Sequence, residues 1–236
     1  MGITGGVKKL KADLKNMTWK QRWEHLWTYY RWVIIVAVMS VMIISVIISC
    51  VINLNTNMLI AGVTINVELD EKGTAALTED FKAEHGTGVK YEDAPLNRIY
   101  LQDFEKTQDY QDNYYTLMSL LSLCSAQELD YIIADQIGME NMLKQEAFLD
   151  LSTFFTAEEL EALGDKVVMA RSAEQADDES IPVVVDITEL AFVQGFANVG
   201  EDDKVYCGVV QNSPRLEQVR QIWEVINGYH FELTEE

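Results

Sequence analysis

The stretch Trp32–Ile52, WVIIVAVMSVMIISVIISCVI, divides the chain into parts of different character. Its 21 residues include no charged residue, no proline and no glycine. As a helix it would be about 31 Å long, which matches the hydrocarbon core of a bilayer. A soluble helix of this length would show a polar stripe. The stretch therefore predicts a transmembrane helix over 32–53 rather than a buried core helix.

Charge is distributed unequally on the two sides of this helix. The segment 1–31 carries seven basic residues against two acidic ones, whereas 54–236 carries 11 basic and 36 acidic residues, within a net charge of −20. The basic excess predicts a cytoplasmic N-terminus and an extracytoplasmic segment 54–236. Both the basic region and the apolar run are longer than those of a cleaved signal peptide. We therefore expect a single-pass signal-anchor in the cell membrane.

The partners expected from these charges differ along the chain. The lipid bilayer is the expected partner of the apolar span and of its basic flank. The strongly acidic outer segment argues against nucleic-acid binding, which needs a basic face.

Ile47-Ile48-Ser49-Cys50 leaves a second form of attachment open. It resembles a bacterial lipobox, in which the cysteine is lipidated and becomes the new N-terminus. The alternative is an ordinary cysteine embedded in the membrane. In both cases the outer segment stays tethered to the membrane.

The end of the basic segment predicts a helix at the membrane surface. Thr18-Trp19-Lys20-Gln21 fits a capping box, after which aromatic and basic side chains recur at helical spacing. Such side chains gather at membrane interfaces, and the residues expected there are Trp19, Trp23, Trp27, Tyr30, Arg31 and Trp32. Two interpretations remain open: a helix on the inner leaflet that contacts a partner, or a topology signal with an aromatic anchor.

The outer segment, 54–236, predicts one α/β domain with its own core. Apolar runs predict strands at 58–67, 89–91, 130–134 and 204–211, and a hairpin that joins 167–170 to 181–185. Amphipathic stretches predict helices at 74–84, 111–127, 139–145, 156–163 and 213–228. Because strands and helices alternate, we expect a mixed or largely parallel sheet with helices on both faces.

Two of these helices carry further expectations. The inward face of 111–127 is expected to hold Tyr114, Leu117, Met118, Leu121 and Cys124, and that of the last helix Leu216, Val219, Ile222, Trp223 and Ile226. A second interpretation of Tyr110, Tyr114 and Tyr115 is an exposed surface for a carbohydrate or peptide.

Three stretches resemble the extracytoplasmic solute-binding proteins of ABC importers, the periplasmic-binding-protein type 2 family. They are 77–91, then Leu117–Ala134 with Phe148–Ser152, and finally Val209–Ile226. The resemblance implies a fold like one lobe of such a protein. Family members usually hold their ligand between two lobes, but only about 50 residues, 152–203, are available here for a second one. The resemblance thus implies one lobe plus a remnant.

A shorter resemblance concerns the membrane boundary. Tyr29-Tyr30-Arg31-Trp32 resembles the start of the span in short single-pass membrane proteins of Gram-positive bacteria. This resemblance implies no activity.

The outer segment contains no motif typical of catalysis: no HExxH, G-x-S-x-G, Walker A or G-x-G-x-x-G. We therefore expect no catalytic residues, no metal, no cofactor and no enzymatic activity. Cys124 and Cys207 leave two interpretations, buried hydrophobic residues or a disulfide. The acidic clusters 177–179 and 201–203 are interpreted as solvated loop tips, with ion binding as the alternative.

The expected function is non-catalytic binding of a protein or surface ligand, as an accessory of a membrane complex. The alternative is the solute-binding component of an ABC importer. A second lobe of real size would favour the alternative.

Overall fold

The structure is a computed structural model, which describes residues 18–54, 57–104, 107–171, 180–196, 198–200 and 203–228. The chain divides into two compact units, Met1–Asn55 and Thr56–Glu236.

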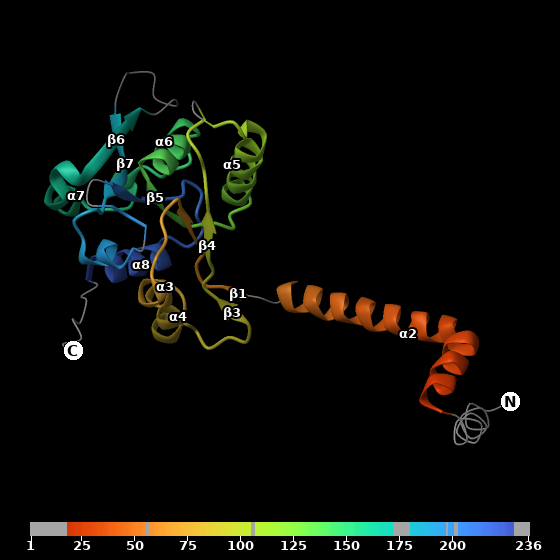
Figure 1. The fold of residues 1–236 in the computed structure, drawn as a ribbon. Helices are drawn as coiled ribbons and strands as arrows, with labels where there is room; N and C mark the ends of the chain where they lie inside the picture. The colour runs from red at the N-terminus through yellow and green to blue at the C-terminus, as the bar shows by residue number, and fades with distance from the viewer. Residues whose placement is uncertain are drawn as a thin grey trace, which may run out of the picture. The chain divides into compact units, whose positions relative to one another are not determined.

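The described part of the first unit is one long helix, α2 (Trp19–Leu54), which begins directly after Thr18. Figure 1 shows this helix bent near its N-terminal end. Of the described helices, it is the one that is long and apolar enough to cross a membrane, over Arg31–Cys50. The Ser40 hydroxyl donates to the carbonyl of Val36 at 2.8 Å, so this polar group is satisfied within the helix. By length and composition, α2 could be a membrane anchor or a signal sequence.

The second unit is built on a six-stranded sheet in the order β4-β2-β5-β8-β7-β6. Strand β2 pairs in parallel with β4 and β5, whereas β8, β7 and β6 continue the sheet in antiparallel pairs. The strands are β2 (Gly62–Ile65), β4 (Leu96–Ile99), β5 (Tyr131–Asp135), β6 (Val167–Arg171), β7 (Ser180–Asp186) and β8 (Val205–Val209). A separate parallel pair joins β1 (Asn57–Met58) to β3 (Glu92–Asp93). The expected mixed α/β architecture is confirmed.

Helices cover both faces of this sheet (Figure 1). One face packs against α5 (Tyr110–Ser125) and α6 (Gln136–Lys144). The other packs against α3 (Glu71–Leu77), α4 (Glu79–His85), α7 (Ala157–Leu163) and α8 (Leu216–Gly228). Short 3-10 segments are η1 (Leu151–Thr153), η2 (Gly164–Lys166) and η3 (Ala191–Gly195).

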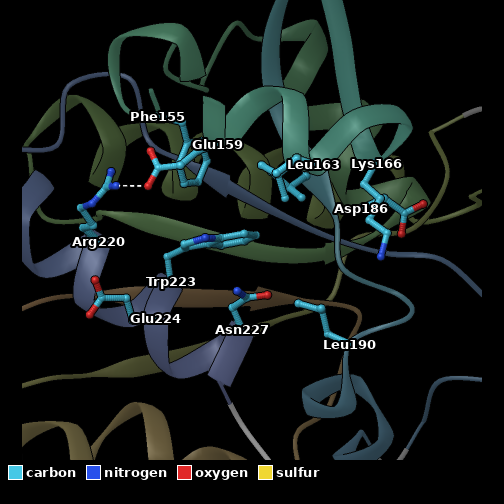
Figure 2. Close-up of a pocket in the computed structure, with 12 residues that line it drawn as sticks. Phe155, Glu159, Leu163, Lys166, Asp186, Leu190, Arg220, Trp223, Glu224 and Asn227 are labelled. Carbon is cyan, nitrogen blue, oxygen red and sulfur yellow. Dashed lines mark hydrogen bonds and ion pairs between the residues drawn. The ribbon is translucent and has the colours of Figure 1, made fainter. Parts of the chain in front are cut away.

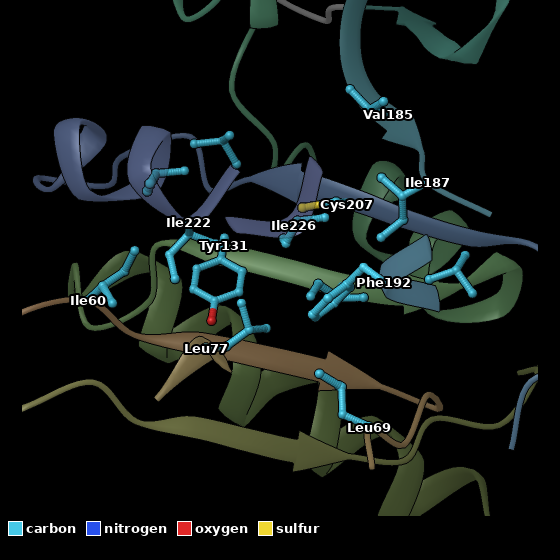
Figure 3. Packing of buried hydrophobic residues seen from close by; sticks show 14 of the residues in the cluster. Ile60, Leu69, Leu77, Tyr131, Val185, Ile187, Phe192, Cys207, Ile222 and Ile226 are labelled. Carbon is cyan, nitrogen blue, oxygen red and sulfur yellow. The ribbon is translucent and has the colours of Figure 1, made fainter. Parts of the chain in front are cut away.

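Two clusters of buried hydrophobic residues lie on opposite faces of the sheet. The larger one surrounds the ring of Tyr131, as Figure 3 shows. Tyr131 lies opposite Gly62 on the neighbouring strand, and a Cβ added at Gly62 would lie only 2.2 Å from the Tyr131 Cζ. Only glycine therefore leaves room for this ring. Among the described residues no hydrogen-bond partner is found for the Tyr131 hydroxyl, although the side chain is fully buried.

Local sequence signals predict several elements correctly. Thr156 and Glu159 form the reciprocal hydrogen bonds of a capping box at the start of α7. Strands β6 and β7 pair as the expected antiparallel hairpin. The helices α5, α6 and α8 lie close to their expected positions.

The strands near the first helices differ from expectation. The predicted strand 89–91 is wrong, because β3 and β4 follow it at 92–93 and 96–99. The predicted strand 58–67 is divided, because the Leu59 amide donates to the carbonyl of Asp93 and the Gly62 amide to that of Pro95. The chain thus changes its pairing partner between β1 and β2.

The expected inward face of α5 is also partly wrong. Leu117 and Cys124 are buried as expected, but Tyr114 and Met118 are 42% and 37% exposed. The reason is Asn113, which is buried and exchanges two hydrogen bonds with the backbone of Gln102, both at 2.9 Å. This pair turns the tyrosines outward. On α8, Leu216 is likewise exposed at 38%.

The segment 152–203 does not provide a second lobe in its described residues. It contributes α7 and the strands β6 and β7, which extend the same sheet. The residues from Thr56 onward form one compact unit. The resemblance to a lobe of a solute-binding protein stays a prediction.

Candidate functional site

The path of the chain across the sheet reverses at β2. After β2 the chain passes through α3 and α4 to β4 on one side, and after β4 it passes through α5 to β5 on the other. The carboxyl ends of β2 and β5 are therefore neighbours whose connections leave in opposite directions. In open α/β sheets, ligands bind at such a switch point.

A cavity of about 440 Å³ lies at this switch point. It is bordered by the end of β2, the end of β5 with the first turn of α6, and the segment that precedes β8. The lining residues are Asn66, Val67, Asp103, Asp135, Gln136, Ile137, Glu140, Asn198, Val199, Asp203 and Lys204. We call it the switch-point cavity.

Asn66 connects three segments at the floor of this cavity. Its Nδ2 donates to the carbonyl of Leu101 at 2.7 Å and to Asp135 Oδ1 at 3.0 Å, and its Oδ1 accepts from the Leu101 amide at 2.8 Å. Its backbone has a φ of 61°, which asparagine tolerates better than most residues. The side chain thus holds the ends of β2, β4 and β5 together.

Asn198 closes the cavity from a distant part of the sequence. Its Nδ2 donates to the carbonyl of Asn66 at 2.8 Å, and its Oδ1 accepts from the amide of Glu68 at 2.7 Å. Two asparagines therefore fix the polypeptide directly after β2.

Asp135 is the carboxylate at the centre of this arrangement. It caps α6 by accepting from the Gly138 amide at 2.7 Å. Burial raises the pKa of Asp135 above its ordinary value, and the negative charges of Asp203 and Glu140 raise it further, although the hydrogen bonds from Gly138 and Asn66 oppose the shift. A carboxyl with a raised pKa in a cavity is typical of a functional site.

The cavity carries an excess of negative charge. Four acidic residues line it against one basic residue, Lys204. That lysine is 3.2 Å from Asp186 Oδ2, and this hydrogen bond raises the pKa of Lys204. The field in the cavity therefore favours a cationic group. Among the described residues, no three metal-ligating side chains are grouped as a metal site requires.

A second cavity, of about 410 Å³, lies between α7, β7 and α8 (Figure 2). Its base is aromatic, with the rings of Phe155 and Trp223 edge to face at 5.4 Å. Arg220 pairs with Glu159, and Lys166 lies 3.0 Å from Glu189. Because both cations of this cavity are already paired, it has little to offer an anionic ligand.

The expected membrane-interface residues lie on α2. Trp19, Trp27 and Trp32 are 81%, 52% and 68% exposed, and the guanidinium of Arg31 lies 5.7 Å from the Trp32 ring centroid. The side chains of the other two, Trp23 and Tyr30, lie outside the described residues.

Cys124 and Cys207 do not form a disulfide, because they lie in the two clusters on opposite faces of the sheet. Both are buried free thiols, and burial raises the pKa of Cys124 to about 11 and that of Cys207 to about 12. Such thiols are unreactive at neutral pH. Cys50 is a free and exposed cysteine on α2.

Sequence reasoning missed the residues that build the switch-point cavity. Asn66 directly follows the buried strand β2, and Asp135 is the last residue of the buried strand β5. Their position at the strand ends is the one sequence signal that points to this cavity. Nothing local marks Asn198. Of the two acidic clusters, 177–179 lies outside the described residues, and Asp203 of the other lines the cavity.

Comparison of the chain with protein-family models, with curated proteins and with solved structures found no match.

Proposed function

We propose that this chain is a single-pass membrane protein whose domain, 54–236, binds a ligand outside the cell without catalysing a reaction. The observation that carries the proposal is the switch-point cavity, which is polar, acidic and framed by hydrogen bonds among Asn66, Leu101, Asp135 and Asn198. Because these side chains are fixed before a ligand arrives, little ordering entropy is lost on binding.

The charge of the cavity supports a ligand that bears an amine. An ammonium group would find Asp135, Glu140 and Asp203 around it, and hydrogen-bond acceptors suit its three N–H donors. We propose that this amine belongs to a partner protein or to another molecule of the cell surface, which the domain binds as an accessory of a membrane complex.

The anchor in this proposal is α2. Its apolar stretch and its exposed tryptophans support insertion into lipid, and the basic segment 1–31 supports a cytoplasmic N-terminus. The aromatic and basic residues from Trp19 to Trp32 would then lie at the inner interface.

The alternative is the solute-binding component of an ABC importer, a member of the family that the sequence resembles. Such a protein encloses a small free solute between two lobes. The described part of 152–203 extends the first sheet instead, so no second lobe covers the switch-point cavity in the described residues. This arrangement favours a ligand held by a partner over a free solute.

The test is a thermal-unfolding titration of the full chain in lipid nanodiscs, with spermidine as the cationic probe and glutamate as the anionic one. At one hundred times its dissociation constant, a ligand stabilises by about 2.7 kcal/mol, which raises the Tm of a domain of this size by about 5–10 °C. Spermidine should produce such a rise, and glutamate should not.

Variants separate the cavity from general charge effects. Glu140→Gln and Asp203→Asn should each reduce the effect of spermidine, whereas Glu161→Gln, an exposed residue of α7 outside both cavities, should not. Equal responses of all three would refute the cavity as the site. Cross-linking in native membranes would then decide between partners: recovery of importer subunits would support the alternative.

A further inference from the structure

We infer that the loop 86–91 of the domain lies in the headgroup layer of the outer leaflet and gives the domain a second contact with the lipid surface. The inference rests on the proposed membrane anchor. It concerns a surface distinct from the switch-point cavity.

The first argument is the length of the chain between helix and loop. Helix α2 ends at Leu54 and β1 begins at Asn57, so two residues separate them. A chain spans at most about 3.3–3.6 Å per residue, which keeps Asn57 within about 11 Å of Leu54. The interfacial layer on each side of a bilayer is about 5–8 Å thick. The start of β1 is therefore held close to the headgroups in any orientation of the domain.

The second argument is the pairing of β1. The Asn57 amide donates to the carbonyl of Tyr91 at 3.0 Å, and β1 pairs with β3 directly after this loop. Tyr91, the last residue of the loop, therefore lies directly beside Asn57, and the loop leads up to it. Figure 1 shows β1 and β3 side by side, at the opposite end of the domain from β6.

The third argument is the chemistry of the loop. Val89 and Tyr91 are 51% and 44% exposed, and the Lys90 Nζ lies 4.7 Å from the ring centroid of Tyr91. An aliphatic, a basic and an aromatic side chain in sequence form the combination that membrane interfaces favour: the ring lies at headgroup level and the ammonium reaches the phosphates.

The fourth argument is that the loop is held in shape. Glu92 accepts hydrogen bonds from the Thr87 amide at 2.9 Å and from the Thr87 hydroxyl at 2.8 Å. Tyr91 has a φ of 64°, a conformation that is unusual for an aromatic residue. An unfavourable backbone held in place by its surroundings is typical of residues with a function. Here it fixes an exposed aromatic ring next to the tether.

The test uses the full chain in vesicles that contain phosphatidylcholine and phosphatidylglycerol. A nitrobenzoxadiazole probe is attached to Val89→Cys in a Cys50→Ser background, in which the two remaining native thiols are buried. Lipids with a nitroxide near the headgroup should quench this probe strongly. The same probe at Met169→Cys, an exposed residue of β6, should be quenched much less.

Two further variants make each outcome decisive. Lys90→Gln should shift the insertion equilibrium of the loop by about fivefold and lower the quenching at position 89. A probe at Val46→Cys, inside the apolar run, should be quenched by lipids with a nitroxide deep in the acyl chain. Quenching at 46 without quenching at 89 would overturn the loop contact alone. Absence of both would overturn the membrane anchor and the loop contact with it.

Discussion

Arg215 donates a hydrogen bond from Nε to Oδ2 of Asp130 at 2.8 Å, and Asp130 is completely buried. The same carboxylate accepts from the Ala61 amide at 2.7 Å and from the Ser213 hydroxyl at 2.6 Å. It therefore joins the start of β5 to the residues before β2 and before α8. These hydrogen bonds lie at the amino ends of the parallel strands β2 and β5, at the opposite edge of the sheet from the switch-point cavity.

Replacement of Arg215 by alanine should destabilise the domain strongly. It would leave Asp130 buried without its cation, a change that costs about 3–5 kcal/mol. Arg220→Ala is the matched control, because its partner Glu159 is half-exposed and such pairs contribute about 0–1 kcal/mol. Chemical denaturation of the full chain in detergent micelles measures both. Similar losses for the two arginines would contradict the buried network.

Tyr131→Phe should leave the free energy of unfolding unchanged or raise it by up to about 2 kcal/mol. The substitution removes a buried hydroxyl for which the described residues offer no partner, and a buried polar group without a partner costs about 1–3 kcal/mol. Tyr115→Phe, at an exposed tyrosine of α5, should have no effect. A marked loss of stability in the Tyr131 variant would reveal a hydrogen bond to that hydroxyl.

Gly62→Ala should destabilise the domain by about 1–3 kcal/mol or more, because the new methyl group would collide with the Tyr131 ring. Gly164→Ala serves as a control for open space, since nothing lies within 4 Å of a Cβ there. Its φ of 55° still carries a local backbone cost of about 1 kcal/mol. Thermal melts of both variants should rank Gly62→Ala as the more damaging.

The buried thiols should resist alkylation in the folded chain. In a Cys50→Ser background, iodoacetamide at about pH 8 should modify neither Cys124 nor Cys207, whose pKa values are raised to about 11 and about 12. After denaturation both should react, and mass spectrometry counts the adducts. A mass two units lower, with no adducts after denaturation, would instead indicate a disulfide.

Binding of spermidine should weaken as the pH falls. The weakening should begin at a higher pH than it would if Asp135 had the pKa of an ordinary aspartate. Protonation of Asp135 removes a negative charge from the cavity, and the pKa of Asp135 is raised above its usual value. Affinity is therefore fully present above this raised pKa and is lost as the pH falls through it. Calorimetric titrations from about pH 8 to about pH 4 would show the midpoint. Asp135→Asn, which preserves the helix cap, should remove that step.

The correctly predicted features depend on residues that are close together in the sequence. The capping box at Thr156 involves residues three positions apart, and the paired strands β6 and β7 follow one another along the chain. The apolar run of α2 has no compensating polar face. Each of these signals lies within a short stretch of sequence, so it can be interpreted without knowing how the domain packs.

What the sequence did not predict depends on distant partners. Strand β4 has no apolar alternation of its own, and it exists because it pairs with β2. The predicted inward face of α5 is wrong at Tyr114, because the aromatic ring is the more hydrophobic of the two neighbours but Asn113 is the buried one. The backbone partners of Asn113 at Gln102 cannot be inferred from the local sequence. The switch-point cavity combines Asn66 with Asn198 across 132 positions, so only the strand ends gave a hint.

Strand β5 carries an aspartate at each boundary, and the two aspartates have separate tasks. Asp130 secures the amino end within a network of buried hydrogen bonds, whereas Asp135 faces the cavity at the carboxyl end. Substitutions at cavity residues that form no hydrogen bond with β5, such as Glu140 and Asp203, can therefore accumulate without loosening that strand. Sequence drift could retune the ligand preference of this edge while the domain keeps its fold, which makes the scaffold well suited to diversification.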